Sequence, residues 1–358
     1  MIALDRIATV KAWRLSLPLV RPYHLSLGAI EAFDTIVVEV SDGERKGYGE
    51  ATYVDGYTDE TAEAAWDRTK ELCTLVSGVS TAIARGRLAP LLADAPFTVS
   101  AFGTALDMLE GNERLSVATE TRVALLALLQ GETEDEIARD IDHAIARGYH
   151  TLKIKVGFNA DEDLARMRTI QRVNAGRCKL RLDANQGYSR EDATRFATTL
   201  DPDSIELFEQ PCAKEDWDSA AAVARVATVP MMLDESIYDV ADIERAAQLN
   251  AARFIKLKLV KAGSVDTLVR DLTRIRELGM EPVLGNGVAS EISNWMEACA
   301  ARGVVTNALE SNGFLKPRRS IVSRPLRFEN GAIVLEPGWT PELDLAAIEA
   351  QSTAVASA

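Results

Sequence analysis

The chain has 358 residues, 47% of them hydrophobic, and a formal net charge of −14 at pH 7, so it can bury a substantial core in one large or two smaller domains. The acidic balance argues against a nucleic acid or an anionic membrane surface as partner, because proteins that bind these use clustered Lys and Arg. The four cysteines are scattered without a CxxC pair, and no apolar run reaches the roughly 18 residues of a membrane span, which predicts a protein of the reducing cytoplasm.

The first part of the chain is predicted to be strands followed by helices. Residues 7–54 alternate apolar and polar positions around a turn at Asp42-Gly43, which is typical of antiparallel strands joined by a hairpin. Apolar residues then recur at helical spacing over 59–75 and 99–111. This order indicates an α+β domain over residues 1–115.

From residue 122 the chain alternates short apolar strands with amphipathic helices. The predicted strands cover 123–129, 151–155, 179–183, 204–209, 230–234, 253–258, 282–285 and 304–309. Their ends lie 24 to 28 residues apart, which suits one strand, one helix and two loops. Eight such units predict a parallel (β/α) barrel of the TIM type within residues 116–310. The remaining segment, 311–358, is expected to return to the first domain.

Charged residues stand at the ends of five successive predicted strands, where a barrel builds its active site. In chain order they are Lys153 and Lys155, Asp183, Glu209, Asp234, and Lys256 and Lys258. Side chains alternate along a strand, so each lysine pair shares one face and the acids lie between the pairs. A single Asp at a strand end is more often a helix cap. Three acids at one rim would repel each other without a cation, and all-oxygen ligands favour Mg²⁺, with Mn²⁺ as a substitute.

This set of residues predicts proton transfer next to a carboxylate. A hard cation can stabilise the enediolate that forms when the α-proton of a small-molecule carboxylate is removed. Lys155 can act as the base if the neighbouring ammonium of Lys153 lowers its pKa. Two other classes of barrel protein fit these residues less well. The three acids argue against an aldolase-type barrel that forms a Schiff base through Lys258, and the complete lysine pairs argue against a noncatalytic acid-binding barrel.

Several motifs resemble those of the enolase superfamily, in the muconate lactonizing enzyme subgroup. The motifs are "VSDGERKGYGEA", "KIKVG", "LDANQGY", "FEQP", "LDES" and "IKLKLVKAGS", and they span nearly the whole chain. The resemblance implies an enolase-like modified barrel with an N-terminal capping domain that the C-terminal tail completes. It also implies Mg²⁺ ligands at Asp183, Glu209 and Asp234 and acid/base residues at Lys155 and Lys258. Lys153 would tune Lys155, and Asn185 would support the site.

The resemblance also suggests residues that contact the substrate. His24 and Arg21 lie in "RPYHLSLG", which corresponds to a loop that closes over substrate in this family, and Arg21 could pair with a distal substrate carboxylate. For both, the alternative is an ordinary solvated loop residue. Glu310, at the end of the eighth predicted strand, is a further supporting candidate. No histidine lies at the seventh strand, which argues against the mandelate racemase subgroup.

The predicted function is a magnesium-dependent isomerase that removes the proton alpha to a carboxylate. Racemisation or epimerisation of an amino-acid derivative, either an N-acyl amino acid or a dipeptide, is favoured over muconate-type cycloisomerisation. A dehydratase or an o-succinylbenzoate synthase would use the same site. The sequence identifies no single substrate, and it leaves a homo-oligomer open.

Overall fold

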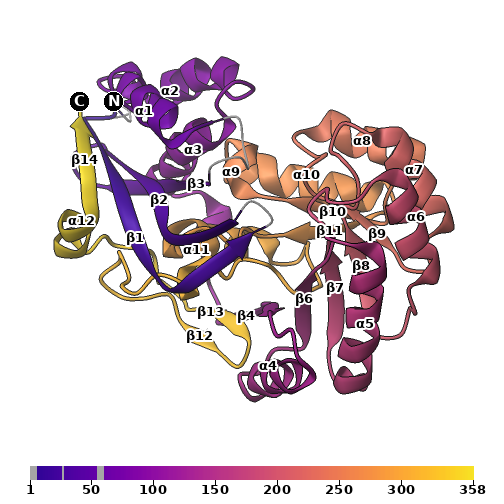
Figure 1. Cartoon of the computed structure of the whole chain (residues 1–358). Coiled ribbons are helices and arrows are strands. Elements are labelled where there is room, and N and C mark those ends of the chain that lie inside the picture. The colour runs from indigo at the N-terminus through magenta and orange to yellow at the C-terminus, as the bar shows by residue number, and fades with distance from the viewer. Residues whose placement is uncertain (1–5, 26–27, 55–59) are drawn as a thin grey trace.

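An antiparallel sheet forms one side of the molecule. The structure is a computed structural model that describes residues 6–25, 28–54 and 60–358. The sheet has the order β14-β1-β2-β3 and consists of β1 (Thr9–Leu25), β2 (Gly28–Ser41), β3 (Lys46–Tyr53) and β14 (Ser352–Ser357). The predicted hairpin is confirmed, because Ser41 pairs with Lys46 and Gly43 takes a φ of 99°. Strand β14 comes from the opposite end of the chain and pairs with β1, so the C-terminal segment completes this sheet (Figure 1).

Helices cover one face of this sheet. They are α1 (Ala62–Val76), α2 (Thr81–Leu88), a 3₁₀ turn (Ala89–Leu91) and α3 (Pro96–Glu110), followed by a second 3₁₀ turn (Glu113–Leu115). Helices α1 and α3 confirm the two predicted helices. Helix α3 lies directly on β3, since a Cβ on Gly47 or Gly49 would come within 2.0 or 1.9 Å of an α3 carbonyl oxygen.

Seven parallel strands form the barrel wall in chain order. They are β5 (Ala127–Leu129), β6 (Thr151–Lys155), β7 (Lys179–Asp183), β8 (Ile205–Glu209), β9 (Met231–Leu233), β10 (Phe254–Leu257) and β11 (Glu281–Leu284). The helices that follow them on the outside are α4 (Glu134–Ala146), α5 (Ala160–Asn174), α6 (Arg190–Thr199), α7 (Trp217–Val226), α8 (Val240–Leu249), α10 (Val265–Glu277) and α11 (Glu291–Ala301). Polar N-caps begin them. Thr133, for example, forms a capping box with Glu136.

The prediction of an eighth strand over residues 304–309 is wrong. Within the described chain this segment makes only an isolated parallel bridge, between Leu309 and Leu125. It nevertheless closes the ring, because the N–H of Leu309 donates to the Ala124 carbonyl and the N–H of Glu310 donates to the Leu284 carbonyl. The segment 123–129, predicted as the first barrel strand, is not a single strand either. Residues 121–124 form β4 (Thr121–Ala124), which pairs with β13 (Ala332–Leu335) in a separate sheet, and only β5 joins the barrel.

Side chains explain why the eighth segment forms no regular ladder. The guanidinium of Arg181 donates to the Ala308 carbonyl at 2.8 Å and to the side chain of Asn307 at 3.1 Å. The amide of Asn307 in turn donates to the Pro282 carbonyl at 2.9 Å. Backbone groups that a ladder would use are thus bound by the polar side chains of Arg181 and Asn307.

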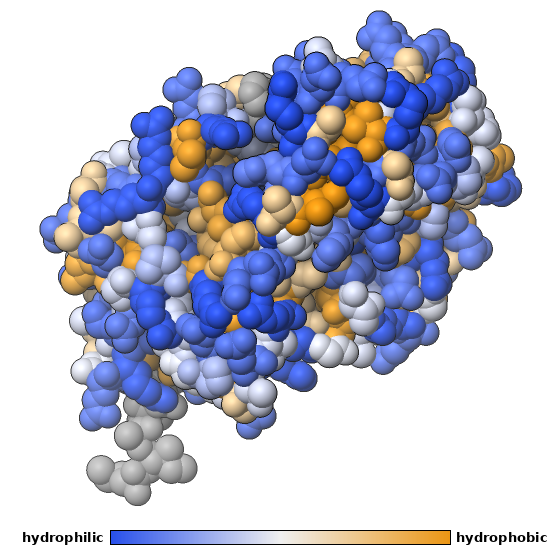
Figure 2. All heavy atoms as spheres, turned by 90° about the horizontal axis from the view of Figure 1, so that it is seen from below, coloured by the Kyte–Doolittle hydropathy of each residue, from blue (hydrophilic) through white to orange (hydrophobic). Residues whose placement is uncertain are grey.

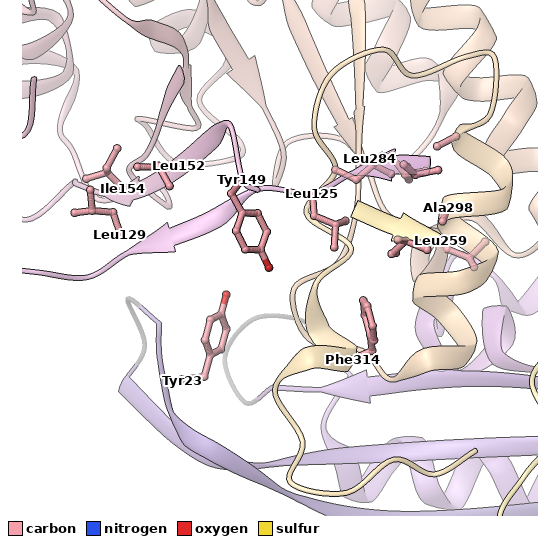
Figure 3. Packing of buried hydrophobic residues seen from close by; sticks show 14 of the residues in the cluster. Tyr23, Leu125, Leu129, Tyr149, Leu152, Ile154, Leu259, Leu284, Ala298 and Phe314 are labelled. Atoms are coloured by element: carbon pink, nitrogen blue, oxygen red, sulfur yellow. The ribbon is translucent and has the colours of Figure 1, made fainter. Parts of the chain in front are cut away.

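The C-terminal segment serves both parts of the molecule. After a 3₁₀ turn (Gly313–Leu315), β12 (Phe328–Glu329) and β13 extend the small sheet of β4, and α12 (Leu345–Gln351) leads into β14. The domain boundaries at residues 115 and 310 stay a prediction. Apolar side chains from the capping strand, the barrel and the tail, including Tyr23, Ile154 and Phe314, belong to one buried cluster (Figure 3).

One face of the molecule is mostly polar. Seen from below, hydrophilic side chains cover most of that face, and apolar side chains appear in separate small groups (Figure 2). Among the described residues, no helix is both long enough and apolar enough to cross a membrane.

Candidate active site

Lys153 lies at the centre of a buried cluster of charges at the carboxyl ends of the barrel strands. Its ammonium nitrogen is 2.8 Å from an oxygen of Asp183, 3.0 Å from Glu209 and 2.8 Å from Glu310. Burial alone would lower the pKa of Lys153, but the charges of these acids outweigh it and hold the pKa well above its usual value. The ammonium therefore stays charged inside the barrel.

Lys256 reaches the same acids from the opposite wall. Its ammonium is 3.0 Å from Glu209, 3.2 Å from Asp234 and 2.5 Å from Glu310. Strands β6 and β10, which carry the two lysines, are separated by three strands in the sheet. Because both ammonium groups contact Glu209 and Glu310, the cluster spans the barrel interior.

The two predicted acid/base lysines lie at the edges of this cluster. The ammonium of Lys155 is 2.7 Å from Asp183 and also donates to the amide oxygen of Asn185. Lys258 directly follows β10, at the start of α9 (Leu259–Ala262), and its ammonium is 2.6 and 2.7 Å from the two oxygens of Asp234. Each lysine is therefore held by an acid on its own side of the barrel.

The acids differ in their preferred protonation state. Burial, together with the charge of Asp183, raises the pKa of Glu209 to about 7 although two lysines oppose this. Burial also acts to raise the pKa of Asp183, but the charges of Lys153 and Lys155 dominate and lower it to about 2. One acid of the pair thus stays ionised while its neighbour titrates near neutral pH.

Asp183, Glu209 and Asp234, the predicted metal ligands, lie at adjacent strand ends and are 0%, 1% and 3% exposed. Among the described residues, no three Asp, Glu, His or Cys side chains converge as around a bound metal, and the ammonium groups of Lys153 and Lys256 lie between the carboxylates. The donor chemistry nevertheless fits a hard cation. All the donors are carboxylate oxygens, and the Glu209 oxygen that makes no hydrogen bond lies 3.0 Å from the ammonium of Lys153, so only an ion pair offsets its charge.

Asn185 connects the site to an acid that the sequence reasoning did not select. Its backbone has a φ of 41°, its N–H donates to Asp183 at 2.9 Å, and its side-chain amide donates to Glu235 at 2.9 Å. Glu235 is 6% exposed, and its second oxygen has no hydrogen bond. Alternation along a strand would turn Glu235 away from Asp234, but β9 already ends at Leu233, so alternation does not apply there.

The remaining predicted residues lie in different places. Glu310 belongs to the central cluster, as described above. Arg21 and His24 lie on a strand and not in a loop, because β1 extends to Leu25 after an irregularity in its pairing between Pro18 and Tyr23. That this segment closes over the substrate stays a prediction. Arg21 is exposed and lines a separate cavity beside the site. The backbone of His24 pairs with Ala29, and its side chain lies outside the described residues.

Comparison with known proteins agrees with this architecture. Residues 136–347, more than half of the chain, match the family described as enolase C-terminal domain-like. The chain is also similar to the L-Ala-D/L-Glu epimerase of Clostridium acetobutylicum, with 27% identity over 347 residues that cover 90% of this chain and 95% of the relative.

Two solved structures share the whole fold. One is the dipeptide epimerase of Cytophaga hutchinsonii complexed with Mg and D-Ala-L-Val, with a TM-score of 0.88, 19% identity and coverage of 98% of this chain and 99% of that one. The other is the muconate lactonizing enzyme of Pseudomonas fluorescens complexed with muconolactone, with a TM-score of 0.88 and 22% identity. The match covers 98% of this chain and 100% of that one. The chain therefore belongs to the enolase superfamily, in the family of muconate lactonizing enzymes and mandelate racemases.

Proposed function

We propose that the chain is a magnesium-dependent isomerase that removes and returns the proton alpha to the carboxylate of an amino-acid derivative. The observation that carries this proposal is the placement of Lys155 and Lys258, which flank one buried carboxylate cluster from opposite walls of the barrel. Two bases on two faces of one carbon can take a proton from one side and deliver another from the opposite side. That is the requirement for racemisation or epimerisation.

The neighbouring residues would hold the two lysines in place for this chemistry. Asp183 holds Lys155 and Asp234 holds Lys258, so each ammonium is oriented before a substrate arrives. Asn185 fixes Lys155 further through its amide oxygen. Lys153 supplies a second positive charge beside the acids, where a substrate carboxylate would need compensation.

Asp183, Glu209 and Asp234 are the residues that would hold Mg²⁺, and Mn²⁺ would be accepted as well because both ions prefer oxygen donors. When bound, the ion would offset the negative charge that develops on the substrate carboxylate as the proton leaves.

The relatives support the reaction class but leave two kinds of isomerase. The C. acetobutylicum relative is an epimerase, and the C. hutchinsonii neighbour was solved with Mg and a dipeptide, which favours racemisation or epimerisation of an N-acyl amino acid or a dipeptide. The neighbour complexed with muconolactone makes a cycloisomerase the second candidate. A Schiff-base mechanism is disfavoured, because the ammonium of Lys258 is paired with both oxygens of Asp234 rather than standing as a free amine.

Hydrogen exchange tests the proposal. The chain is incubated in deuterated water with a panel of N-acyl amino acids, dipeptides and lactones, before and after removal of divalent ions. We expect a mass gain at the α-carbon of one compound class that disappears on chelation and returns with Mg²⁺. Full exchange in the metal-free chain, or no exchange in any member of the panel, would contradict the proposal, whereas trapping by borohydride would support the Schiff-base alternative.

We also propose that the chain acts in the cytoplasm, since all four cysteines are free and buried. That it forms a homo-oligomer stays a prediction.

A further inference from the structure

Glu297 is a buried acid that lies outside the central charge cluster. It belongs to α11, in which every residue is buried, and it is 0% exposed. One of its oxygens accepts the N–H of Leu259 at 3.2 Å. The other accepts the N–H of Asn286 at 3.2 Å, the side-chain amide of Asn294 at 3.2 Å and the hydroxyl of Ser311 at 2.7 Å. A single carboxylate therefore ties three segments of the barrel rim to α11.

The first of these contacts holds the backbone next to Lys258. Leu259 is the first residue of α9, and an N–H at the start of a helix has no acceptor within the helix. Lys258 cannot cap it, because a lysine side chain only donates hydrogen bonds and this one is bound to Asp234. Leu259 and Ala298, the residue after Glu297, belong to the same buried cluster (Figure 3). Glu297 thus supplies the acceptor that α9 lacks.

The second oxygen of the carboxylate is the more firmly anchored one. Ser311 directly follows Glu310, an acid of the central charge cluster. Asn294 stiffens the same region, because its amide also donates to the Asn286 carbonyl at 3.1 Å and its oxygen accepts the N–H of Phe314 at 3.0 Å. Three donors meet this oxygen, whereas one donor meets the other. The carboxylate is therefore fixed on the Glu310 side and reaches from there to α9.

The cost of burying Glu297 points to these backbone contacts as its role. Burial raises the pKa of Glu297, and its four hydrogen bonds act against that rise. All four partners are neutral, so no cation among them offsets the desolvation of the carboxylate. An apolar side chain would avoid this cost but would leave the N–H groups of Leu259 and Asn286 without an acceptor. The acid is explained by the segments that it holds rather than by the packing around it.

The segment of the opposite lysine is held by other residues. Arg166 donates to the carbonyl of Lys155 at 3.0 Å, and Asp163 accepts the N–H of Gly157 at 3.0 Å. Both holding residues lie in α5, which follows the strand of Lys155. A change at Glu297 therefore leaves the supports of Lys155 in place.

We propose that Glu297 is a positioning residue for Lys258. Its carboxylate fixes the start of α9 relative to the segment of Glu310, and this aims the ammonium of Lys258 at one face of the substrate α-carbon. This inference rests on the proposed function, because it takes Lys258 as the base on one face and Lys155 as the base on the other.

Two variants remove the contact with α9 and keep the rest. Glu297→Gln has nearly the same size, but its side chain has one oxygen and one NH₂ group. The oxygen should face the three donors near Ser311, which turns the NH₂ group toward the N–H of Leu259, where two donors then oppose each other. Glu297→Asp, which keeps the charge, is the second variant in case Glu297→Gln does not fold. Its shorter side chain cannot hold both sides and should also give up Leu259.

Glu291→Gln is the matched control, because it makes the same substitution on the same helix. Glu291 is 4% exposed, and its carboxyl group is hydrogen-bonded to the side chain of Ser320 and the backbone of Ile321 in the C-terminal segment. This variant removes a buried acid of α11 without touching the contacts of α9.

Amide hydrogen exchange measures whether the start of α9 loosens. In Glu297→Gln and Glu297→Asp the amide of Leu259 should exchange about tenfold faster or more, because its N–H loses its acceptor, while the amide of Gly157 should keep its rate. Glu291→Gln should leave both rates unchanged. Parent-like exchange of Leu259 in the folded Glu297 variants overturns the inference, whatever reaction the chain catalyses.

Exchange of the substrate α-proton measures the effect on Lys258. The Mg²⁺-loaded chains receive each pure stereoisomer of the panel compound that exchanges fastest, in deuterated water. Both Glu297 variants should slow the exchange that Lys258 carries out about tenfold or more relative to the one that Lys155 carries out, in kcat rather than in KM. Glu291→Gln should keep the parent ratio. Equal slowing of both exchanges overturns the inference and leaves the proposed function intact. A loosened Leu259 in a chain whose parent exchanges no panel compound overturns the proposed function and supports the hold of Glu297 on α9.

Discussion

At the scale of single residues, the two flanking lysines make the most direct prediction. Lys155 and Lys258 would each face one side of the substrate α-carbon, so each should exchange the proton of one stereoisomer only. Lys258→Ala should abolish net inversion yet leave deuterium exchange into the stereoisomer that Lys155 serves, and Lys155→Ala should show the mirror result. Losing a positioned base should slow the affected exchange by about 10²- to 10⁴-fold. Proton NMR of each pure stereoisomer in deuterated water measures both exchanges.

The outcome also separates the candidate reactions. A cycloisomerase needs one lysine for proton transfer and uses the other for its charge, so only one variant would lose all exchange. If both single variants still interconverted stereoisomers at the parent rate, the two-base interpretation would be wrong.

Asp234→Asn tests the metal ligands. The substitution keeps the size of the side chain but removes the negative charge that lies between Lys256 and Lys258. We expect Mg²⁺ affinity to fall sharply, and stability of the metal-free chain to fall on the order of 3–5 kcal/mol because two buried ammonium groups lose a shared partner. Calorimetric titration with Mg²⁺ and urea unfolding measure the two effects. Parent-like Mg²⁺ affinity would remove Asp234 from the ligand set.

The sequence predicted the central residues because strand ends and side-chain alternation are local features. Lys153, Asp183 and Glu209 needed only a strand position and a barrel to be placed together. The contacts of Lys256 with Glu209 and Glu310 depend on strands that face each other across the barrel, so they could not be read from spacing. Glu297 lies in a helix that is buried on every side, so no apolar face marks which way its side chain points.

At the scale of elements, most helices and strands were predictable, and the exceptions have local causes. The apolar run 123–129 looks continuous, but the structure divides it between two sheets at Leu125. The segment 304–309 has the composition of a strand, yet Arg181 and Asn307 take up hydrogen-bonding groups around it. In both cases distant side chains or strands compete for the same backbone groups, which a single stretch of sequence does not reveal.

Glu50 couples β3 of the capping sheet to helix α11 and makes a pH-dependent prediction. Its carboxylate accepts the N–H of Ser290 at 2.7 Å, the N–H of Ser293 at 3.3 Å and the hydroxyl of Ser290. Burial nevertheless raises the pKa of Glu50 from 4.5 to about 7. Because the folded-state pKa is the higher one, the contribution of Glu50 to stability is fully present below pH 4.5 and is lost as the pH rises through about 7.

Glu50→Gln removes this titration and keeps an acceptor for the two N–H groups. The parent loses stability over this range and the variant does not, so the free energy of unfolding of the variant minus that of the parent should increase by up to roughly 3 kcal/mol as the pH rises from 4 to 8. Urea unfolding at a series of pH values measures this. Glu50→Ala is the contrasting variant, because it leaves the donors without an acceptor and should lose about 1–3 kcal/mol or more at every pH. Parallel pH profiles for the parent and Glu50→Gln would show that Glu50 does not titrate in this range.

At the scale of the whole molecule, the capping helices touch the barrel close to Lys258, one of the two proposed acid/base residues. Helix α3 lies against the turn that ends α9, the short helix that begins after Lys258. The N–H of Gly263 donates to the hydroxyl of Ser100 at 2.8 Å, and the N–H of Val265 donates to Asp107 at 2.7 Å. A Cβ on Gly103 would lie 1.8 Å from the Gly263 carbonyl oxygen, so α3 can approach this closely only because residue 103 is glycine.

Gly103→Ala should therefore act on catalysis from outside the active site. The added methyl group has to push α3 and the α9 turn apart, which should cost about 1–3 kcal/mol of stability as overpacking does. Because Lys258 is joined directly to α9, its ammonium should move, and a displacement near 1 Å can slow a reaction by about 10²-fold. The rate of deuterium exchange should fall further for the stereoisomer whose α-proton Lys258 removes than for the one whose α-proton Lys155 removes.

Gly86→Ala is the matched control, since Gly86 is an exposed residue of α2 whose Cβ would meet nothing within 4 Å. That variant should keep parent activity and gain up to about 1 kcal/mol from better helix propensity. Equal losses in both exchange reactions of Gly103→Ala would mean that the capping helices stabilise the barrel without positioning Lys258.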